Sequence, residues 1–401
     1  MQANDNRPLS LVQFRADFSV QAAVQGFVVA IVGYTSSVAI VIKGLAAVGA
    51  TEGQITSALL FVGLSMGCAA MLLSLTSRMP VSVAWTTPGM ALLGTTGAVA
   101  GGFPAVTGAF IITGALIVVA AFWSPLARFI EAIPKPIANA MLAGILFKLC
   151  LAPFMALQVQ PVAALAVLGV WIVMLRLLRL WAAPAAVLTA LALTAWNGGL
   201  GASLAFAWPR AEFVAPTLNL PALLGVALPL FVVTMASQNI TGLAVLSTFG
   251  YRHRPRDGLM LTGFLSMLTA PFAAPTVNYS AITAAMTAGP EAHPDPLRRY
   301  VTAVSAGLCY ALFGAFAAVA AAVVLKASPV LIEAAAGLAL VAAFGSAMNG
   351  AIAEEEGRLP ALLTFFVAAS GLTLFGIGGA FWGLILGWSV HLLFTKPRKS
   401  A

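Results

Sequence analysis

Two stretches, PVSVAWTTPGM at residues 80–90 and PTVNYSAITAAM at residues 275–286, decide the fold. Each begins with a proline, continues through β-branched and polar residues, and ends in an apolar run that suits a short helix. The pattern predicts a short extended piece followed by a half-length helix that starts in mid-membrane. Non-helical backbone at that depth is tolerated only where it is buried in protein or lines a cavity. The alternative interpretation is a pair of ordinary proline-kinked helices.

The composition around these stretches is that of an integral membrane protein. Of the 401 residues, 61% are hydrophobic and only 8% are charged, against about 25% charged residues in a soluble domain. Cutting the chain at charges, prolines and glycine clusters gives about fourteen apolar segments, judged against the roughly 20 residues that one helical crossing needs. Their approximate spans are 21–42, 54–75, 81–98, 105–124, 136–155, 159–177, 182–198, 222–247, 258–273, 276–288, 299–325, 329–351, 359–374 and 376–394. The sequence therefore predicts an all-α polytopic membrane protein.

The net charge of +8 does not indicate nucleic-acid binding, because the basic residues occur in short clusters between apolar runs. With the N-terminus placed inside, sixteen of the 20 lysines and arginines fall on the inner side. These are Arg7, Arg15, Arg78, Arg128, Lys135, Arg176, Arg179, Arg252, Arg254, Arg256, Arg298, Arg299, Arg358, Lys396, Arg398 and Lys399, and the outer four are Lys43, Lys148, Arg210 and Lys326. This positive-inside bias predicts an even number of segments and two cytoplasmic termini.

The two halves of the chain resemble each other. The stretch FVVAIVGYT from Phe27 matches FVVTMASQN from Phe231, and the two proline-led stretches follow at nearly the same offset. Seven segments per half is an odd number, so the second copy would cross the membrane in the opposite direction, as in many secondary transporters. We therefore expect residues 1–200 and 201–401 to form two inverted repeats. Chance similarity between apolar helices is the alternative.

Candidate substrate-binding residues lie in the broken segments, the third and tenth, and in the related segments one and eight. Inverted-repeat transporters bind substrate near the midplane, where half-helix N-termini offer N–H donors and positive dipole ends to an anion. The candidates are Tyr34, Ser36, Trp85, Thr86, Thr87, Ser237, Gln238, Asn239, Asn278, Tyr279 and Ser280. Interhelical hydrogen bonding alone would also account for such polar groups. Because no lysine or arginine stands out at the centre, these groups predict a site for a small anion held by helix N-termini.

Acidic residues are nearly absent from the membrane segments. Glu333, about a turn into segment twelve, is the one plausible embedded carboxylate, and a helix N-terminal acid favoured by the dipole is its simpler interpretation. The sequence has no cluster of metal ligands, no nucleophile–base pair and no phosphate-binding loop. We therefore expect no catalytic residue, no metal and no cofactor, and a transporter rather than a membrane-embedded enzyme.

Several blocks resemble the benzoate transporter (BenE) family of bacteria. They are GYTSSVAI from Gly33, AWTTPGMALL from Ala84, AMLAGIL from Ala140, LPLFVVTMASQN from Leu228, PEAHPD from Pro290 and SGLTLFGIGGAFWGLI from Ser370. The resemblance covers nearly the whole chain, and MASQN and PEAHPD are its more specific blocks. It implies a proton-coupled benzoate importer of the inner membrane, with the fourteen-segment fold of the uracil and sulfate permease-type carriers.

That fold implies short strands in segments three and ten. It also implies a core domain, from segments 1–4 and 8–11, that moves against a gate domain from segments 5–7 and 12–14. Segment eight of the uracil-type carriers presents a carboxylate to the substrate, whereas the corresponding stretch here, MASQN at residues 235–239, has none. The departure suits an anionic ligand and leaves the proton-coupling group unassigned.

The expected partners are benzoate or a similar aromatic carboxylate, a proton and the lipid bilayer. A homodimer is the assembly to test. Two alternatives stay open. One is a passive anion channel on the same fold, and the other is a carrier for a different small carboxylate.

Overall fold

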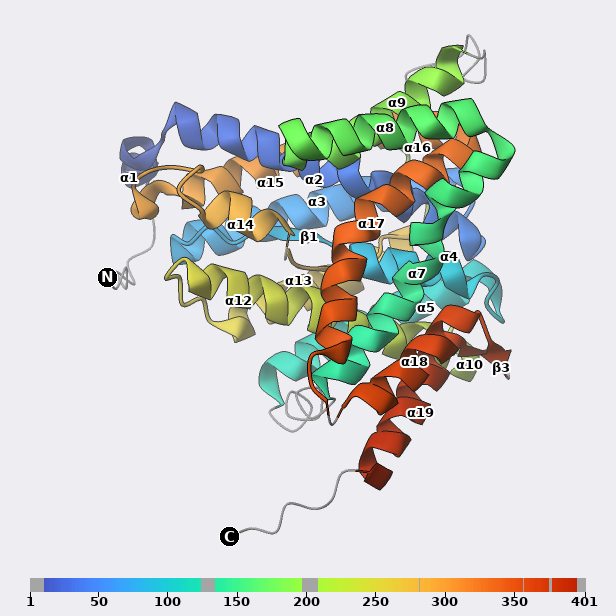
Figure 1. The fold of residues 1–401 in the computed structure, drawn as a ribbon. Helices are drawn as coiled ribbons and strands as arrows, with labels where there is room; N and C mark the ends of the chain where they lie inside the picture. Colours follow the sequence, from blue (N-terminus) through green and yellow to red (C-terminus); the bar gives the residue numbers. More distant parts are fainter. Residues whose placement is uncertain are drawn as a thin grey trace.

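The computed structural model describes residues 11–123, 134–196, 208–280, 282–355, 357–374 and 377–394 of the chain, and Figure 1 shows how they are arranged. The first half contains α1 (Leu11–Asp17), α2 (Val20–Ala47), α3 (Glu52–Ser77), β1 (Val83–Trp85), α4 (Thr87–Thr96), α5 (Gly102–Phe122), α7 (Lys135–Val159), α8 (Pro161–Leu177), η1 (Arg179–Trp181) and α9 (Ala182–Trp196). Of the predicted topology, the basic residues Arg7, Arg128, Lys396, Arg398 and Lys399 and the repeat boundary at residue 200 lie outside the described residues.

The second half is also mostly helical, with three short strands among its described residues. It contains α10 (Leu220–Ala222), η2 (Leu223–Ala227), α11 (Leu228–Thr234), η3 (Met235–Asn239), α12 (Ile240–Thr248), α13 (Pro255–Thr269), η4 (Ala270–Phe272), β2 (Val277–Tyr279), α14 (Ile282–Ala288), η5 (Pro296–Arg298), α15 (Tyr300–Ala315), α16 (Ala317–Lys326), α17 (Pro329–Ile352), α18 (Arg358–Ser370), β3 (Thr373–Leu374), β4 (Ile377–Gly378) and α19 (Gly379–Phe394). The turns η2 and η3 are π-helical and interrupt one long helix from α10 to α12.

The predicted class, a mostly helical polytopic membrane protein, is confirmed. Seven described spans are long and apolar enough to cross a membrane, or eight when the pair at residues 296–315 and 317–326, bent by 65°, counts as one. The helices α8, α18 and α19 are apolar but shorter.

Local sequence determines both ends of α3 and leads the chain into the first strand. Helix α3 starts with a capping box, in which the Thr51 hydroxyl accepts from the Gln54 N–H and the Gln54 side chain accepts from the Thr51 N–H. It ends where Arg78 takes a left-handed conformation, with φ 54°, two residues before Pro80, which has no N–H to continue a helix. The chain then enters β1.

The two proline-led stretches form a two-stranded antiparallel sheet. Val83 lies opposite Tyr279, Ala84 opposite Asn278 and Trp85 opposite Val277. Backbone bonds extend the ladder at both ends, from Ser280 N to Ser82 O (2.9 Å) and from Thr86 N to Thr276 O (3.2 Å). The pairing satisfies backbone groups that would otherwise be costly in a water-free interior.

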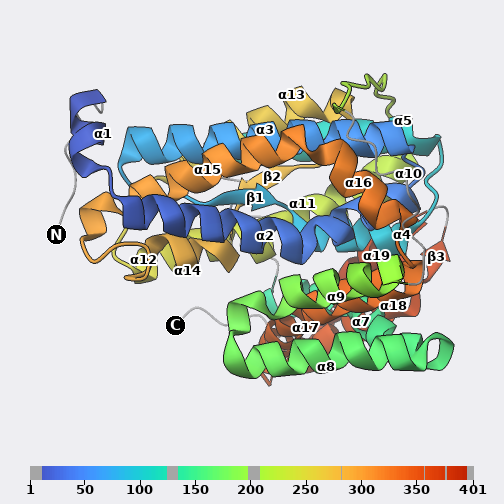
Figure 2. The same cartoon turned by 90° about the horizontal axis from the view of Figure 1, so that it is seen from above.

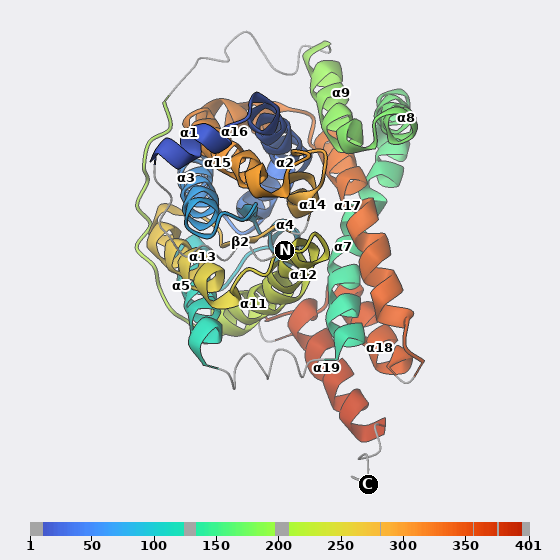
Figure 3. The ribbon, with the colours of Figure 1, turned by 90° about the vertical axis from the view of Figure 1, so that its left-hand side faces the viewer.

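The helices pack in two groups, which Figures 2 and 3 show side by side. The sheet group consists of α2–α5, α10–α16 and the strands β1 and β2, with tight packing of α3 on α15, α5 on α13 and α2 on α15. The second group consists of α7, α8, α9, α17, α18 and α19, and α7 packs along both α17 and α18. It is called the α7–α17 group after the pair of helices α7 and α17, and the name does not denote a range. Contacts of α2 with α9 and α17, and of α4 with α7, join the two groups.

Candidate substrate site

Thr86 fixes the start of α4 inside the sheet group. Its hydroxyl accepts the Gly89 N–H at 3.2 Å and lies 2.9 Å from the Thr234 hydroxyl of α11, and the Thr86 side chain is fully buried. Thr86 is therefore the N-cap of α4. Because the helix dipole is positive at its N-terminus, this buried end of α4 favours negative charge nearby.

Ser280 caps α14 in the same way. Its hydroxyl oxygen accepts from the Thr283 N–H at 3.1 Å and from the Thr283 hydroxyl at 2.6 Å. The Thr283 hydroxyl also lies 2.6 Å from that of Ser82, just before β1. A buried cluster of three hydroxyls therefore connects the beginning of α14 to the opposite strand.

Aromatic rings form the neighbouring wall. The Trp85 indole N–H donates to the Ser37 hydroxyl of α2 at 2.9 Å. The Tyr34 ring lies 5.1 Å from the Trp85 ring and 5.3 Å from the Phe313 ring, centroid to centroid. The Tyr34 hydroxyl is buried and has no hydrogen-bond partner in the described structure, an arrangement that costs about 1–3 kcal/mol.

These elements surround one central pocket, all of it within the sheet group. Its lining residues are Gly33, Ser36, Ser37, Met66, Ala84, Trp85, Thr87, Gln238, Ser280, Thr283 and Tyr310. The empty volume is about 400 Å³, part of it open to the outside, and only about 30 Å³ admits the centre of a water molecule. The pocket is thus narrow, since a single water needs about 10–15 Å³ by that measure, and a benzene ring requires side chains to move apart.

Five of the eleven predicted residues line this pocket: Ser36, Trp85, Thr87, Gln238 and Ser280. Tyr34 lies one layer behind, against Trp85, and Thr86 is the buried cap. The hydroxyl of Ser237 is half-buried and donates to the Val233 carbonyl of its own helix at 2.6 Å. As direct substrate contacts, these residues remain predictions.

The other three, Asn239, Asn278 and Tyr279, support the sheet. The Asn239 amide oxygen accepts the Tyr279 N–H at 3.0 Å, which ties η3 to β2. The Asn278 amide nitrogen donates to the Tyr279 carbonyl at 2.7 Å. The Tyr279 hydroxyl lies 2.9 Å from Nδ1 of His253, in the loop before α13, and all three side chains are fully buried.

Six lining residues were not predicted: Gly33, Ser37, Met66, Ala84, Thr283 and Tyr310. Ser37 directly follows the predicted Ser36, and Thr283 lies three residues after the predicted Ser280, so the hydroxyl pattern was a usable signal. Met66 and Tyr310 belong to long apolar helices, α3 and α15, in which nothing in the local sequence marks them as lining.

The pocket wall carries no charged side chain among the described residues. Glu333 lies elsewhere, at the start of α17, where its carboxylate is 3.4 Å from the Lys43 ammonium of α2. This exposed pair bridges the two helix groups. The described residues also contain no group of three or more histidine, cysteine, aspartate or glutamate side chains that could hold a metal ion.

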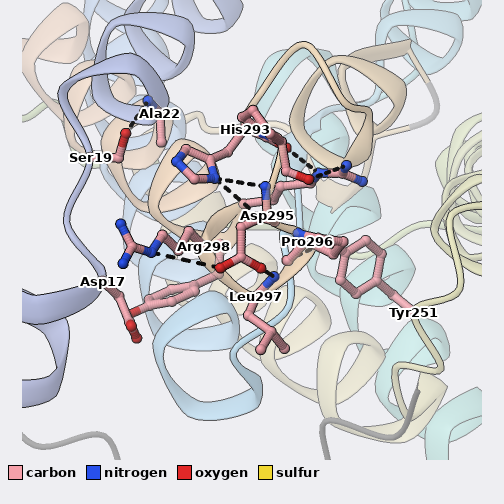
Figure 4. Close-up of polar contacts among 12 residues, drawn as sticks. Asp17, Ser19, Ala22, Tyr251, His293, Asp295, Pro296, Leu297 and Arg298 are labelled. Atoms are coloured by element: carbon pink, nitrogen blue, oxygen red, sulfur yellow. Dashed lines mark hydrogen bonds and ion pairs between the residues drawn. The ribbon is translucent and has the colours of Figure 1, made fainter.

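The PEAHPD block forms a capped loop between α14 and α15, shown in Figure 4. The Asp295 carboxylate accepts the Leu297 N–H at 2.9 Å and lies 3.7 Å from Nε of Arg298, and Nδ1 of His293 accepts the Asp295 N–H at 3.0 Å. Tyr251, in the loop between α12 and α13, anchors the PEAHPD loop by donating to the Pro296 carbonyl at 2.8 Å. These hydrogen bonds explain the PEAHPD sequence by the structure of this loop, which does not line the pocket.

A larger groove lies on another side of the sheet group, between α5 and residues 217–223. Ala105, Ala109, Ile112, Leu218 and Leu220 make most of its surface apolar, and its empty volume is about 580 Å³. A helix also begins here, at α10, where the Asn219 amide oxygen accepts the Ala222 N–H at 2.7 Å. The groove lacks the opposed hydroxyls of the central pocket, so it is the weaker candidate for an anion.

Comparison with known proteins gives consistent matches. The profile of the family described as "BenE: Benzoate membrane transport protein" matches residues 16–393. The chain is 38% identical over 371 residues to "Inner membrane protein YdcO" of Escherichia coli (strain K12), covering 92% of this chain and 95% of that protein. It is 28% identical over 397 residues to the "Benzoate membrane transport protein" of Acinetobacter baylyi, covering 97% and 99%.

Solved structures of transporters share the architecture. The transmembrane domain of the cyanobacterium bicarbonate transporter BicA aligns with a TM-score of 0.57 at 15% identity, covering 92% of this chain and 97% of that one. SLC26A9 aligns with a TM-score of 0.56 at 10% identity, covering 98% of this chain and 72% of that one. At these identities the likeness concerns the fold alone. The fold relation to permease-type carriers that the sequence predicted is confirmed.

Proposed function

Because this chain belongs to the benzoate membrane transport protein (BenE) family, we propose that it is a secondary active transporter that imports benzoate, or a close aromatic carboxylate, by alternating access. The coarser class is a multi-pass inner-membrane transporter, not an enzyme. The benzoate cargo follows the description of the family and the name of the Acinetobacter baylyi relative.

The observation that carries the proposal is the make-up of the central pocket. Thr87 at the start of α4, the cap Ser280 and the amide of Gln238 line it together with the Trp85 indole. Helix N-termini and hydroxyl donors attract a carboxylate, and an aromatic wall suits a benzene ring. Benzoate would lie with its carboxylate between the starts of α4 and α14 and its ring against Trp85.

The division into two helix groups supports alternating access. In this proposal the sheet group is the core domain, from segments 1–4 and 8–11, and the α7–α17 group is the gate domain, from segments 5–7 and 12–14. Every lining residue of the pocket comes from the sheet group. A bound anion would therefore travel with that group as it moves against the α7–α17 group.

We also propose fourteen crossings in two inverted repeats, residues 1–200 and 201–401. The first set is α2, α3, β1–α4, α5, α7, α8 and α9, and the second is α10–α12, α13, β2–α14, α15–α16, α17, α18 and α19. The strand–helix crossing is the third member of each set, which supports the repeat. An inverted pair would bring β1 and β2 together antiparallel, as they are paired here.

The proposed orientation has both termini in the cytoplasm, on the basis of the positive-inside bias. Import would be coupled to protons, with the proton moving on the substrate or on a transiently protonated group around it. Glu333 is a poor candidate for that group, because it is half-exposed, pairs with Lys43 and does not line the pocket. The proposal also includes a homodimer, although the fold of a single chain does not require one.

The deciding experiment is uptake of radiolabelled benzoate into proteoliposomes, with and without an inward proton gradient. Saturable uptake that accumulates benzoate when the gradient is imposed would support the proposal. Uptake that only follows the electrochemical gradient of benzoate would indicate the anion channel instead, and uptake indifferent to benzoate competition would exclude benzoate as the cargo. Gln238→Ala should raise the KM for benzoate, whereas Thr241→Ala, which is exposed on the same helix, should leave the KM unchanged.

A further inference from the structure

Lys148 occupies an unusual place for a lysine. It lies thirteen residues into the 25-residue helix α7, about 20 Å from the start of that helix at 1.5 Å per residue. Lysine near the middle of a membrane-spanning helix costs about 2.5–3.5 kcal/mol on insertion scales, so such residues face a cavity or a partner and mark sites of function. The other lysine of α7, Lys135, is its first residue.

The side chain of Lys148 faces a second pocket at the boundary between the two helix groups. Thr95 and Thr96 at the end of α4, together with Gly225 of η2, form the wall from the sheet group. Lys148, and Gly371 to Thr373 at the β3–β4 hairpin, form the wall from the α7–α17 group. The ammonium nitrogen lies so close to Gly371 that a Cβ at that position would collide with it.

No carboxylate in the described parts of the chain forms an ion pair with Lys148. The nearby hydroxyls of Thr95 and Thr96 both donate to the Leu92 carbonyl, at 2.9 Å and 2.8 Å. The pocket therefore combines a positive charge with polar walls and contains no built-in anion. Its empty volume is about 380 Å³, part of it open to the outside.

Helix α4 connects this pocket to the central one. Thr87 at its start lines the central pocket, and Thr95 lines the pocket of Lys148, which places the two about 12 Å apart along the helix. Because its walls come from both helix groups, the pocket of Lys148 widens when the groups separate.

We propose that Lys148 is a second anion-binding site, which captures the carboxylate of the substrate on the side of the β3–β4 hairpin and passes it along α4 to the central pocket. The inference rests on the proposed function, because it assigns this site to the same substrate. In the proposed orientation the hairpin side is the outer side. The competing role is structural, in which the ammonium only offsets the negative C-terminal ends of α18, which ends at the C-cap Gly371, and of α4.

The test compares Lys148→Met, Lys148→Arg and the control Lys326→Met, which changes a lysine of the same proposed side outside this pocket. Initial rates of labelled benzoate uptake into proteoliposomes give KM and the maximal rate. Loss of one charge-assisted hydrogen bond should raise the KM of Lys148→Met about tenfold, with a maximal rate within about twofold of wild type. Lys148→Arg and Lys326→Met should keep the wild-type KM.

A wild-type KM in Lys148→Met, or an equal defect in Lys148→Arg, would overturn the inference while leaving the central site intact. If the wild-type protein takes up no benzoate, the proposed function fails and the inference fails with it. Size-exclusion profiles and thermal melts of the purified variants separate a folding defect from a change in KM. A structural role alone predicts a lower melting temperature with no change in KM.

Discussion

The hydrogen bond between Trp85 and Ser37 offers a sharp test of the central pocket. Both side chains line it, and the indole N–H donates to the Ser37 hydroxyl at 2.9 Å. Trp85→Phe keeps an aromatic ring but removes the donor, and Ser37→Ala removes the acceptor with little change in volume. Each variant frees the ring at position 85 to leave the orientation in which it forms the pocket wall.

The expected size follows from the bond. One intramolecular hydrogen bond contributes about 0.5–1.5 kcal/mol net, which corresponds to a factor of about two to ten in an equilibrium constant. If the bond positions the ring for benzoate, each single variant should raise the KM by about that factor. The double variant should be no worse than the poorer single variant, because the bond can be lost only once.

The assay is the KM for labelled benzoate uptake measured for the wild type, the two single variants and the double variant. The coupling energy of this cycle isolates the pair from the smaller size of phenylalanine. Strictly additive effects, or a wild-type KM in Ser37→Ala, would refute the conclusion that Ser37 orients the wall of the substrate pocket.

Three further predictions concern residues around the pocket. Asn239→Ala leaves the buried Tyr279 N–H without its acceptor, so the free energy of unfolding should fall by about 1–3 kcal/mol; a melting temperature equal to that of the wild type would contradict this. Glu333→Gln removes an exposed ion pair with Lys43 that is worth about 0–1 kcal/mol, so proton-driven uptake should persist, and loss of its dependence on the proton gradient would contradict the argument. Burial lowers the pKa of His253 from its ordinary 6.5, while the charge of Asp257 raises it. The folded protein therefore takes up this proton less readily than the unfolded chain, and stability should fall as the pH drops below about 6.5. Between pH 7.5 and pH 5.5 the melting temperature of His253→Gln should fall less than that of the wild type. An equal fall in both proteins would refute the assignment of this pH dependence to His253.

The strand-plus-helix elements could be predicted because their causes are local. A proline at 80 or 275, β-branched residues after it and a hydroxyl cap such as Thr86 are visible in the sequence. The pairing of β1 with β2 joins residues far apart in the chain, so its register could be found only in the structure. The same limit applies to the partner of α3, which is α15 of the second half.

The site was only partly predictable because a polar residue in an apolar helix can either line a pocket or hydrogen-bond to a neighbouring element. Gln238 lines the pocket whereas its neighbour Asn239 binds the backbone of β2, and nothing in MASQN separates these roles. Tyr310 lines the pocket from a helix with ordinary apolar spacing. Lys148 was assigned to the outer side because positive-inside counting assigns sides to loops and does not give depth within a helix.

The central claim, that an aromatic carboxylate binds between the starts of α4 and α14, is tested most directly by locating the ligand itself. A crystal structure with 4-bromobenzoate would show the bromine by its anomalous scattering. We expect one peak beside the Trp85 ring, with carboxylate density directed at Thr87 and Ser280. A bromine peak in the apolar groove between α5 and residues 217–223, with none in the central pocket, would contradict the account.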